Sequence, residues 1–282
     1  MPSNRRKKRC CRADAPGQTN LFWANRAKPD AMNVLVVGAG AMGRWFAEAT
    51  NRDLAFTDAD PAVAERAANE LGGKAVELDT SETFDAVCLA VPLLAVEEAI
   101  EDHAGKAERA ILDLTGVMAE PVSAMADHAP GKERVSLHPL FAPDNAPGNV
   151  AVVADESGPT TDNLLSALES RGNTLVETTP EEHDEAMTTV QAGAHTAILA
   201  FALSANSVPE GLRTPVYDCL ADLTAQVTDG DSRVYADIQE AFDGAEDVAV
   251  AAQELTDADP TEFERLYRKA KAKTETRAEE KR

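Results

Sequence analysis

Asn33-Val-Leu-Val-Val-Gly-Ala-Gly-Ala-Met-Gly43 is an apolar run that stops on a cluster of glycines just before a helical pattern. This order predicts a strand, a phosphate-binding turn and a helix whose N-terminus faces the phosphates of a dinucleotide. Gly38 permits the tight turn, Gly40 lets the backbone approach a pyrophosphate, and Gly43 lets the helix pack on the strand. The alternative is a glycine turn that binds no ligand.

The surroundings of the glycine turn favour dinucleotide binding. A β-branched strand precedes the turn, and an amphipathic helix that contains Met42, Trp45 and Phe46 follows it. Asp58 ends the next strand twenty positions after Gly38, where the ribose of a dinucleotide needs a hydrogen-bond acceptor. Because an acidic side chain at this place repels a 2′-phosphate, we expect NAD rather than NADP as the cofactor.

The composition restricts the class of protein. The chain has 282 residues, enough for two domains with their own cores, and holds 27 Lys and Arg against 49 Asp and Glu. Such acidity disfavours nucleic acid or an anionic membrane as a partner and suits a halophilic, high-salt cytoplasm, although an ordinary acidic enzyme remains an alternative. The four cysteines show neither a disulfide framework nor a zinc spacing, and no stretch approaches the roughly 18 apolar residues of a membrane span. We therefore expect a cytoplasmic protein that needs no metal.

Residues 1–31 differ in composition from the rest of the chain. They carry eight Lys and Arg against two Asp, which leaves 19 Lys and Arg against 47 Asp and Glu, a net charge of −28, in the remainder. Without periodic apolar positions, this basic head is expected to be disordered. It is either a targeting arm or, as we favour, sequence upstream of a translation start at Met32.

Residues 32–179 are expected to form an NAD-binding α/β domain. Short apolar strands alternate with helical patterns, which is typical of a Rossmann-type, mostly parallel sheet covered by helices. Strands are expected at 33–37, 54–58, 75–78, 85–91, 109–114 and 134–137, and near 150–154 and 174–178. Helices are expected at about 41–51, 60–71, 93–103, 119–129 and 160–171.

Residues 180–282 are expected to form an all-helical substrate and dimerisation domain with a charged C-terminal tail. Thr179-Pro180-Glu181-Glu182 is typical of a capped helix N-terminus, so a long helix should begin here. Its many apolar residues predict a buried central helix, and they exceed what one small bundle covers, which favours a homodimer. Further helices are expected near 213–228, 232–243, 244–256 and 260–277.

Residues that follow strands are the first candidates for chemistry, because ligands collect at the carboxyl ends of strands in a parallel sheet. His138 comes directly after a predicted strand, where an imidazole can accept a proton from a hydroxyl; the alternative is a structural turn residue. Gln191 and His195 lie four positions apart on one face of the long helix. Their polar atoms need partners, either a bound substrate or the neighbouring helices.

Several motifs together resemble those of the prephenate dehydrogenase family. In chain order they are Gly38-Ala-Gly-Ala-Met-Gly43, Val91-Pro92, Asp113-Leu-Thr-Gly-Val117, His138-Pro-Leu-Phe-Ala-Pro143, Glu182-His183-Asp184 with Met187, Gln191 and His195, and Thr214-Pro-Val-Tyr217 with Tyr235-Ala-Asp-Ile238. The resemblance covers about residues 33–250. It implies NAD-dependent oxidative decarboxylation of prephenate to 4-hydroxyphenylpyruvate in tyrosine biosynthesis, or the corresponding arogenate reaction, by a dimer joined through its helical domains. The cofactor residues would be Gly38, Gly40, Met42, Gly43, Asp58, Val91 and Pro92.

The same resemblance suggests roles for residues near the substrate. It places the histidine that hydrogen-bonds the substrate's 4-hydroxyl at His138, and a histidine of the substrate pocket at His195 with Gln191 nearby. The family usually has serine where this chain has Gly116 and lysine where it has Met118. The hydroxyl that helps to orient His138 is therefore missing, and Thr115 or a water is the candidate replacement.

A second departure concerns the substrate carboxylate. Related enzymes commonly have an arginine where this chain has Gln226, so Arg213 and Arg233, the latter across a dimer interface, are the candidate replacements. Few cations are available for a dianion such as prephenate, and the ammonium group of arogenate would ease its binding. Two other functions remain open, namely another NAD(P)-dependent dehydrogenase and a non-catalytic dinucleotide-binding regulator.

Overall fold

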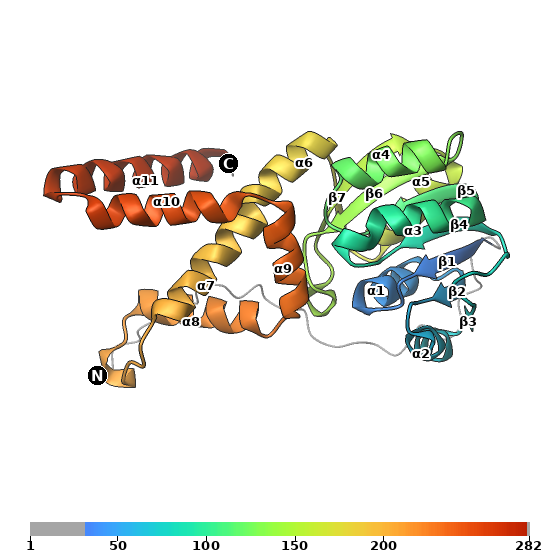
Figure 1. The fold of residues 1–282 in the computed structure, drawn as a ribbon, viewed down its shortest axis with the longest axis horizontal. Coiled ribbons are helices and arrows are strands. Elements are labelled where there is room, and N and C mark those ends of the chain that lie inside the picture. Colours follow the sequence, from blue (N-terminus) through green and yellow to red (C-terminus); the bar gives the residue numbers. More distant parts are fainter. Residues whose placement is uncertain (1–31, 281–282) are drawn as a thin grey trace, which may run out of the picture. The chain divides into compact units, whose positions relative to one another are not determined.

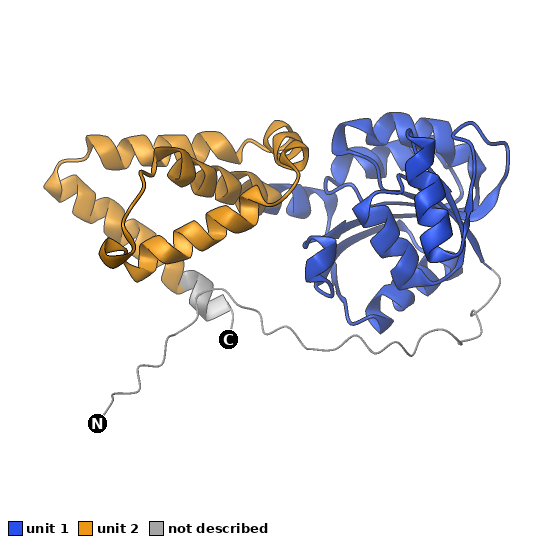
Figure 2. Ribbon diagram, turned by 90° about the horizontal axis from the view of Figure 1, so that it is seen from below, with its two compact units in different colours: residues 1–186 blue, residues 187–282 orange. Residues whose placement is uncertain are grey.

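The computed structural model describes residues 32–280, so the expectations for residues 1–31 concern a segment outside the described part of the chain. The chain divides into two compact units, residues 1–186 (unit 1) and residues 187–282 (unit 2) (Figure 2).

Unit 1 is built on an eight-stranded sheet with the strand order β3-β2-β1-β4-β5-β6-β7-β8 (Figure 1). Its strands are β1 (Asn33–Val37), β2 (Asp53–Thr57), β3 (Lys74–Ala75), β4 (Phe84–Leu89), β5 (Ala107–Asp113), β6 (Glu133–Pro139), β7 (Asn149–Glu156) and β8 (Thr174–Glu177). All neighbouring pairs are parallel except β6 and β7, which are antiparallel. The predicted mostly parallel Rossmann-type sheet is confirmed.

Helices cover both faces of this sheet because its strands alternate their apolar side chains between the two sides. Val34 and Val36 belong to one buried cluster, and Leu35 and Val37 belong to the other. The first cluster includes apolar residues of α1 (Ala41–Thr50), α2 (Pro61–Leu71) and α5 (Pro159–Ser170). The second includes residues of α3 (Val96–His103) and α4 (Ala119–His128).

A long helical segment begins where the sequence predicts it. Thr179 Oγ1 accepts a hydrogen bond from Glu182 N at 3.2 Å, and α6 (Pro180–Met187) follows. A π-helical turn, Thr188–Gly193, then leads into α7 (Ala194–Ser204). The remaining helices of unit 2 are α8 (Pro215–Thr228), α9 (Ser232–Ala241), α10 (Gly244–Asp257) and α11 (Pro260–Glu280). The described part of unit 2 contains only helices and connecting segments, as predicted.

A close approach between two backbones accompanies the π-turn. A Cβ on Gly244 would lie 1.9 Å from the carbonyl oxygen of Thr188, so α10 can pack here only through a glycine. The side chain of Gln239 on α9 donates to the carbonyl of Ala192 at 3.1 Å, which satisfies a backbone acceptor within the turn.

The expectation that the long helix is buried is wrong for the single chain. Only 11% of the most apolar window of Pro180–Ser204 is buried, and the side chain of Leu203 is 89% exposed. The reason is that the chain's own helices cover only part of the apolar surface. This 25-residue helix, with a window of mean hydropathy 1.3, is the one helix among residues 32–280 that is long and apolar enough to cross a membrane, which the sequence analysis did not expect.

Candidate active site

The carboxyl ends of four parallel strands meet at one edge of the sheet in unit 1. Backbone hydrogen bonds tie each strand end to its neighbour: Gly38 N to Thr57 O (2.9 Å), Ala90 N to Val37 O (2.7 Å) and Leu114 N to Leu89 O (2.8 Å). The segments that follow β1, β2, β4 and β5 therefore lie side by side, as expected for a ligand-binding edge. This edge carries the glycine turn and, directly after Ala90, the predicted cofactor residues Val91 and Pro92.

The glycine turn has the tight geometry that its sequence predicts. Gly38 has φ +87°, and a Cβ on it would lie 2.3 Å from the carbonyl oxygen of Ala90. A Cβ on Gly43 would lie 2.0 Å from Gly38 O, so a larger residue there would force α1 away from the turn. Apart from its two chain neighbours, no heavy atom of the described residues lies within 4 Å of a Cβ built on Gly40, which leaves its backbone open to a ligand.

The start of α1 and the carboxylate beside it fit a dinucleotide. Gly40 precedes α1 without a side-chain cap, and the first turn has no acidic residue, so an anion would complete this helix N-terminus. By contrast, α2 is capped by the side chain of Asp60, which accepts from Ala62 N. Asp58 accepts hydrogen bonds from Ala39 N (2.8 Å) and Asp60 N (3.0 Å), which fixes its carboxylate against the glycine turn.

His138 lies within a strand rather than after one. The antiparallel pairing with β7, in which His138 lies opposite Ala151 and Pro139 opposite Val150, extends β6 beyond the expected end at 137. The His138 side chain is 7% exposed. In the following loop, Phe141 packs edge-on against Trp45 of α1, with ring centroids 5.4 Å apart, which connects the end of β6 to the helix of the glycine turn.

A row of hydrogen-bonded side chains continues from His138 to α6. His138 Nδ1 lies 2.9 Å from His183 Nε2, and His183 Nδ1 lies 2.8 Å from Asp184 Oδ1. The Asp184 carboxylate also accepts from the backbone N–H groups of Met118 (3.1 Å) and Ala119 (3.0 Å) at the start of α4. From the sequence, His183 and Asp184 are predicted only as part of a motif. The Glu182-His183-Asp184 signature at a helix start was the available signal, but nothing local shows that it meets a strand 45 residues earlier.

Burial controls the charges of this row. Burial first and the charge of His183 second lower the pKa of His138 to about 3, against a smaller opposing effect of Asp184, so His138 is neutral at pH 7. Burial opposes the charge of Asp184, but the hydrogen bonds from His183 and from the N–H groups of Ala119 and Met118 hold its pKa below the ordinary value.

A buried carboxyl group lies at the end of the adjacent strand. Burial raises the pKa of Asp113 to about 6, although Thr115 donates to Asp113 Oδ2 from its backbone N (3.1 Å) and from Oγ1 (2.8 Å). The Thr115 hydroxyl, the predicted substitute for the family serine, is therefore directed at Asp113 in this structure. Gly116, next in the chain, has φ +94°, and a Cβ on it would lie 3.2 Å from His138 Nε2. Glycine thus leaves space beside the nitrogen that a reacting group would approach.

The predicted substrate residues Gln191 and His195 belong to unit 2. Gln191 lies in the π-turn, and His195 lies on α7 with its ring centroid 4.8 Å from that of Tyr235 on α9. His195 Nδ1 is buried and has no hydrogen-bond partner among the described residues. Burial also lowers the pKa of His195, which favours a neutral ring. An unpartnered buried nitrogen is unfavourable unless a ligand completes its hydrogen bonding.

The two candidate arginines of unit 2 are exposed. Arg213 donates through Nε to Val208 O at 3.1 Å, and its guanidinium lies 5.9 Å from the ring centroid of Tyr217. Arg233 lies near the start of α9, two residues before Tyr235, and Gln226 is exposed on α8. The geometry therefore connects His195 with α9 but does not single out either arginine.

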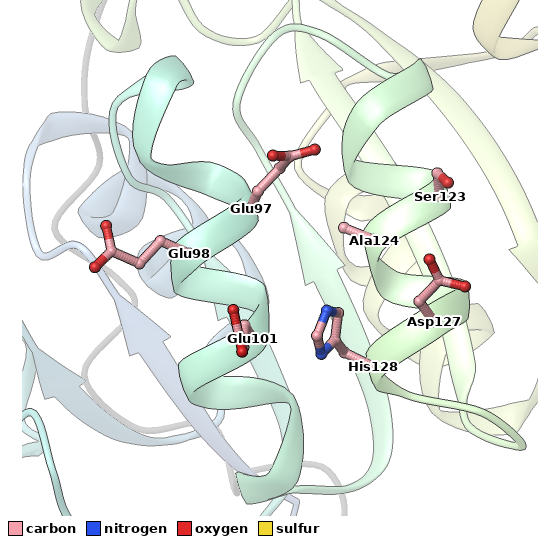
Figure 3. Close-up of a pocket in the computed structure, with 7 residues that line it drawn as sticks. All are labelled: Glu97, Glu98, Glu101, Ser123, Ala124, Asp127 and His128. Carbon is pink, nitrogen blue, oxygen red and sulfur yellow. The ribbon is translucent and has the colours of Figure 1, made fainter.

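A separate hollow of about 400 Å³ lies between α3 and α4 (Figure 3). Its lining includes Glu97, Glu98 and Glu101 of α3 with Asp127 and His128 of α4. It contains none of the predicted site residues. Within residues 32–280, no group of three or more His, Cys, Asp or Glu side chains is placed to bind a metal ion.

Comparisons with known proteins agree with the motifs. A family model described as prephenate dehydrogenase, nucleotide-binding domain, matches residues 46–155. The chain is 34% identical over 232 residues to 4-amino-4-deoxyprephenate dehydrogenase of Streptomyces pristinaespiralis, covering 75% of this chain and 78% of that protein. It is 28% identical over 247 residues to the T-protein of Haemophilus influenzae, covering 82% of this chain but only 61% of that longer protein.

Solved structures share the fold. Prephenate dehydrogenase from A. aeolicus, in complex with hydroxyphenyl propionate and NAD+, superimposes with a TM-score of 0.67 at 17% identity, covering 90% of this chain and 99% of that one. Arogenate dehydrogenase from Synechocystis superimposes with a TM-score of 0.56 at 16% identity, covering 87% and 99%. At these identities the likeness establishes the architecture alone.

Proposed function

The chain belongs to the prephenate dehydrogenase family, and on this basis we propose that it catalyses the NAD-dependent oxidative decarboxylation of prephenate to 4-hydroxyphenylpyruvate. The observation that carries the proposal is the buried, neutral His138 in a unit whose sheet edge also holds the open glycine turn and Asp58. A neutral imidazole close to a dinucleotide site is suited to accept a proton while a hydride is removed.

The chain's own groups account for proton transfer and orientation. NAD+, when bound, supplies the acceptor for the hydride of the carbinol carbon. His138 Nε2 accepts the proton of the 4-hydroxyl, and Gly116 leaves the space for that approach. The electron pair of the breaking carbon–carboxylate bond makes the ring aromatic as carbon dioxide leaves. The proton then returns to the phenolic oxygen, so that the reaction releases no net proton.

The cofactor preference follows from one carboxylate. We assign NAD rather than NADP because Asp58 is fixed beside the glycine turn by two backbone N–H groups. A ribose hydroxyl can donate to this carboxylate, whereas a 2′-phosphate would be repelled by it. The phosphates of the cofactor would occupy the uncapped start of α1.

A second candidate substrate carries an amino group. The relative at 34% identity is named for 4-amino-4-deoxyprephenate, and arogenate also bears an ammonium group. The charge of the chain supports a substrate with an amino group. Residues 32–282 carry a net charge of −28, and the candidates for binding the substrate's carboxylates are the exposed Arg213 and Arg233. An ammonium group offsets part of the charge that these few cations must bind. His195, Gln191 and Thr115 remain the proposed further contacts with the substrate.

The proposed assembly is a cytoplasmic homodimer. Val190 is 55% exposed and Leu203 is 89% exposed on the long helix, and a second copy would remove this apolar surface from water. Light scattering in high salt should give twice the chain mass. A monomer, or sedimentation with lipid vesicles, would contradict this assembly.

The direct test is an assay of the purified chain with NAD+ or NADP+ and each of prephenate, arogenate and 4-amino-4-deoxyprephenate. We expect cofactor reduction coupled to carbon dioxide release, with NAD+ preferred. Reduction without decarboxylation would point to another dehydrogenase. Binding of NAD+ without turnover of any of the three substrates would favour a dinucleotide-binding regulator.

A further inference from the structure

His138 is the first member of a hydrogen-bonded row, and we propose that His183 and Asp184 act behind it as a proton relay. The relay would share the positive charge that arises when His138 accepts the substrate's proton. This inference rests on the proposed function for its chemical step. Its structural part, the hydrogen-bonding state of two histidines, can be tested without any substrate.

The protonation state of the row follows from its one carboxylate. Ionised Asp184 can only accept hydrogen bonds, so His183 must donate to it through Nδ1–H. In neutral His183 the other ring nitrogen, Nε2, is then an acceptor, and His138 must donate to it through Nδ1–H. His138 Nε2 is thereby fixed as an acceptor, and it is the ring atom nearest to the position of a Cβ on Gly116.

The relay itself is a balanced shift of two protons. The substrate's hydroxyl proton moves to His138 Nε2 while the Nδ1 proton of His138 moves to His183 Nε2. His138 ends neutral, and His183 becomes a cation that still donates to Asp184. Both shifts reverse when the phenolic oxygen takes its proton back.

The charges around His183 favour such a cation. Asp184 on α6 lies 2.8 Å from its Nδ1, and Asp113 at the end of β5 also interacts with it electrostatically. Asp184 is held in turn by two N–H groups at the start of α4, so it does not move when the charge changes. His138 is deeply buried, and burial first and the charge of His183 second lower its pKa to about 3, so it is a weak base without the relay.

The experiment compares full-length His183→Gln and Asp184→Asn with His128→Gln, an exposed histidine of α4. In His183→Gln the amide oxygen can still accept from His138 Nδ1–H but cannot take a proton. For His183→Gln we expect kcat to fall by about ten- to a hundredfold, which is less than the full contribution of a general base. KM for NAD+ and the unfolding temperature should stay close to those of the parent. Asp184→Asn should lower kcat less, and His128→Gln should leave it unchanged.

The pH profile separates a relay from a merely structural contact. In the parent, a proton already held by the pair of histidines blocks the relay, so activity falls on acidification. In His183→Gln only the weakly basic His138 remains, and the acidic limb of kcat should move to lower pH. If His183→Gln lowers the maximal kcat but leaves the acidic limb of the pH profile at the same pH as in the parent, the relay is overturned.

Nitrogen-15 spectra of the histidine rings give a readout that does not depend on turnover. At neutral pH we expect the His138 ring to be protonated at Nδ1, with this signal changed in His183→Gln and unchanged in His128→Gln. Protonation at Nε2 would overturn the proposed row even if the chain is active. An inactive parent with the expected spectra would refute the proposed function and with it the chemical step, but would leave the hydrogen-bonding assignment intact.

Discussion

Two histidines, one in each unit, are held in opposite ways. His138 lies in a strand of unit 1, and its Nδ1 is bonded to His183, which is bonded to Asp184. His195 lies on a helix of unit 2 against the ring of Tyr235, and its buried Nδ1 has no partner in the described part of the chain. The first histidine is oriented from within the protein. The second retains hydrogen-bonding capacity for something outside it.

This difference separates two kinds of functional residue. A group that handles a proton needs a fixed tautomer, which requires partners behind it. A group that recognises a substrate gains most from a desolvated atom whose partner arrives with the ligand. Substitutions should therefore affect kcat in unit 1 and KM in unit 2.

The largest effect is expected for His138→Asn. Loss of the proton acceptor should lower kcat by about two to four powers of ten and remove the pH dependence of the rate, while NAD+ still binds. Steady-state kinetics across pH, cofactor titration and thermal unfolding measure the three quantities. Unchanged turnover with reduced stability would make His138 a structural residue and remove the contrast between the units.

Asp113→Asn tests whether the ionised form of the buried Asp113 destabilises unit 1. The pKa of Asp113 is raised to about 6 from 3.8, so the stability that its protonated form contributes is complete below pH 3.8 and is lost as pH rises through 6. The asparagine side chain does not ionise, so the variant does not lose this stability as the pH rises. Its free energy of unfolding relative to the parent should rise by about 2 kcal/mol between pH 4 and pH 7. Urea unfolding measures this difference, the exposed Asp127→Asn is the control, and a difference that stays constant with pH would contradict the buried charge.

His195→Phe examines unit 2. The substitution keeps a ring against Tyr235 but removes the unpartnered nitrogen, so the unfolding temperature should stay the same or rise. If the nitrogen binds substrate, KM should rise by about ten- to a hundredfold with a smaller change in kcat. Tyr235→Phe keeps the ring contact and serves as the control. A decrease in kcat without a change in KM would indicate that His195, like His138, acts in the chemical step and not in substrate binding.

Asp58→Ser should have the smallest effect. Removal of the carboxylate should narrow the preference for NAD+ over NADP+ by about tenfold, because the repulsion of a 2′-phosphate disappears. The ratio of kcat/KM values for the two cofactors measures it. Asp60→Ser removes the same charge two residues away while keeping a capping side chain for α2, and it should leave that ratio unchanged.

Local patterns predicted the elements well and their ends less well. The consecutive apolar residues of β1 and the glycines after it define a strand and a turn without reference to the rest of the chain. The end of β6 depends on its partner, because the pairing with β7 carries the strand through His138. Strand periodicity alone contains no information about that pairing.

Contacts between distant residues were beyond the sequence. His138 was found because it lies near a strand end, where parallel sheets place their ligand sites, whereas Asp113 was named only as part of a motif. His183 meets His138 only after α6 has packed beside the sheet edge, and no spacing rule predicts which side chain of a helix start will do so. The prediction that the long helix is buried failed for a similar reason. An apolar pattern does not show whether another part of the same chain or a second molecule covers the helix.

The π-turn at Thr188–Gly193 sets the rotational phase of α7. If the same residues adopted ordinary α-helical geometry, with none removed, everything beyond them would rotate by about 100° around the helix axis. His195 would then leave the ring of Tyr235, although no side chain of the site had been changed. Gly244 is far from His195 in the sequence, but it packs against this π-turn, so a larger residue at position 244 would disturb the segment that sets the direction of that histidine.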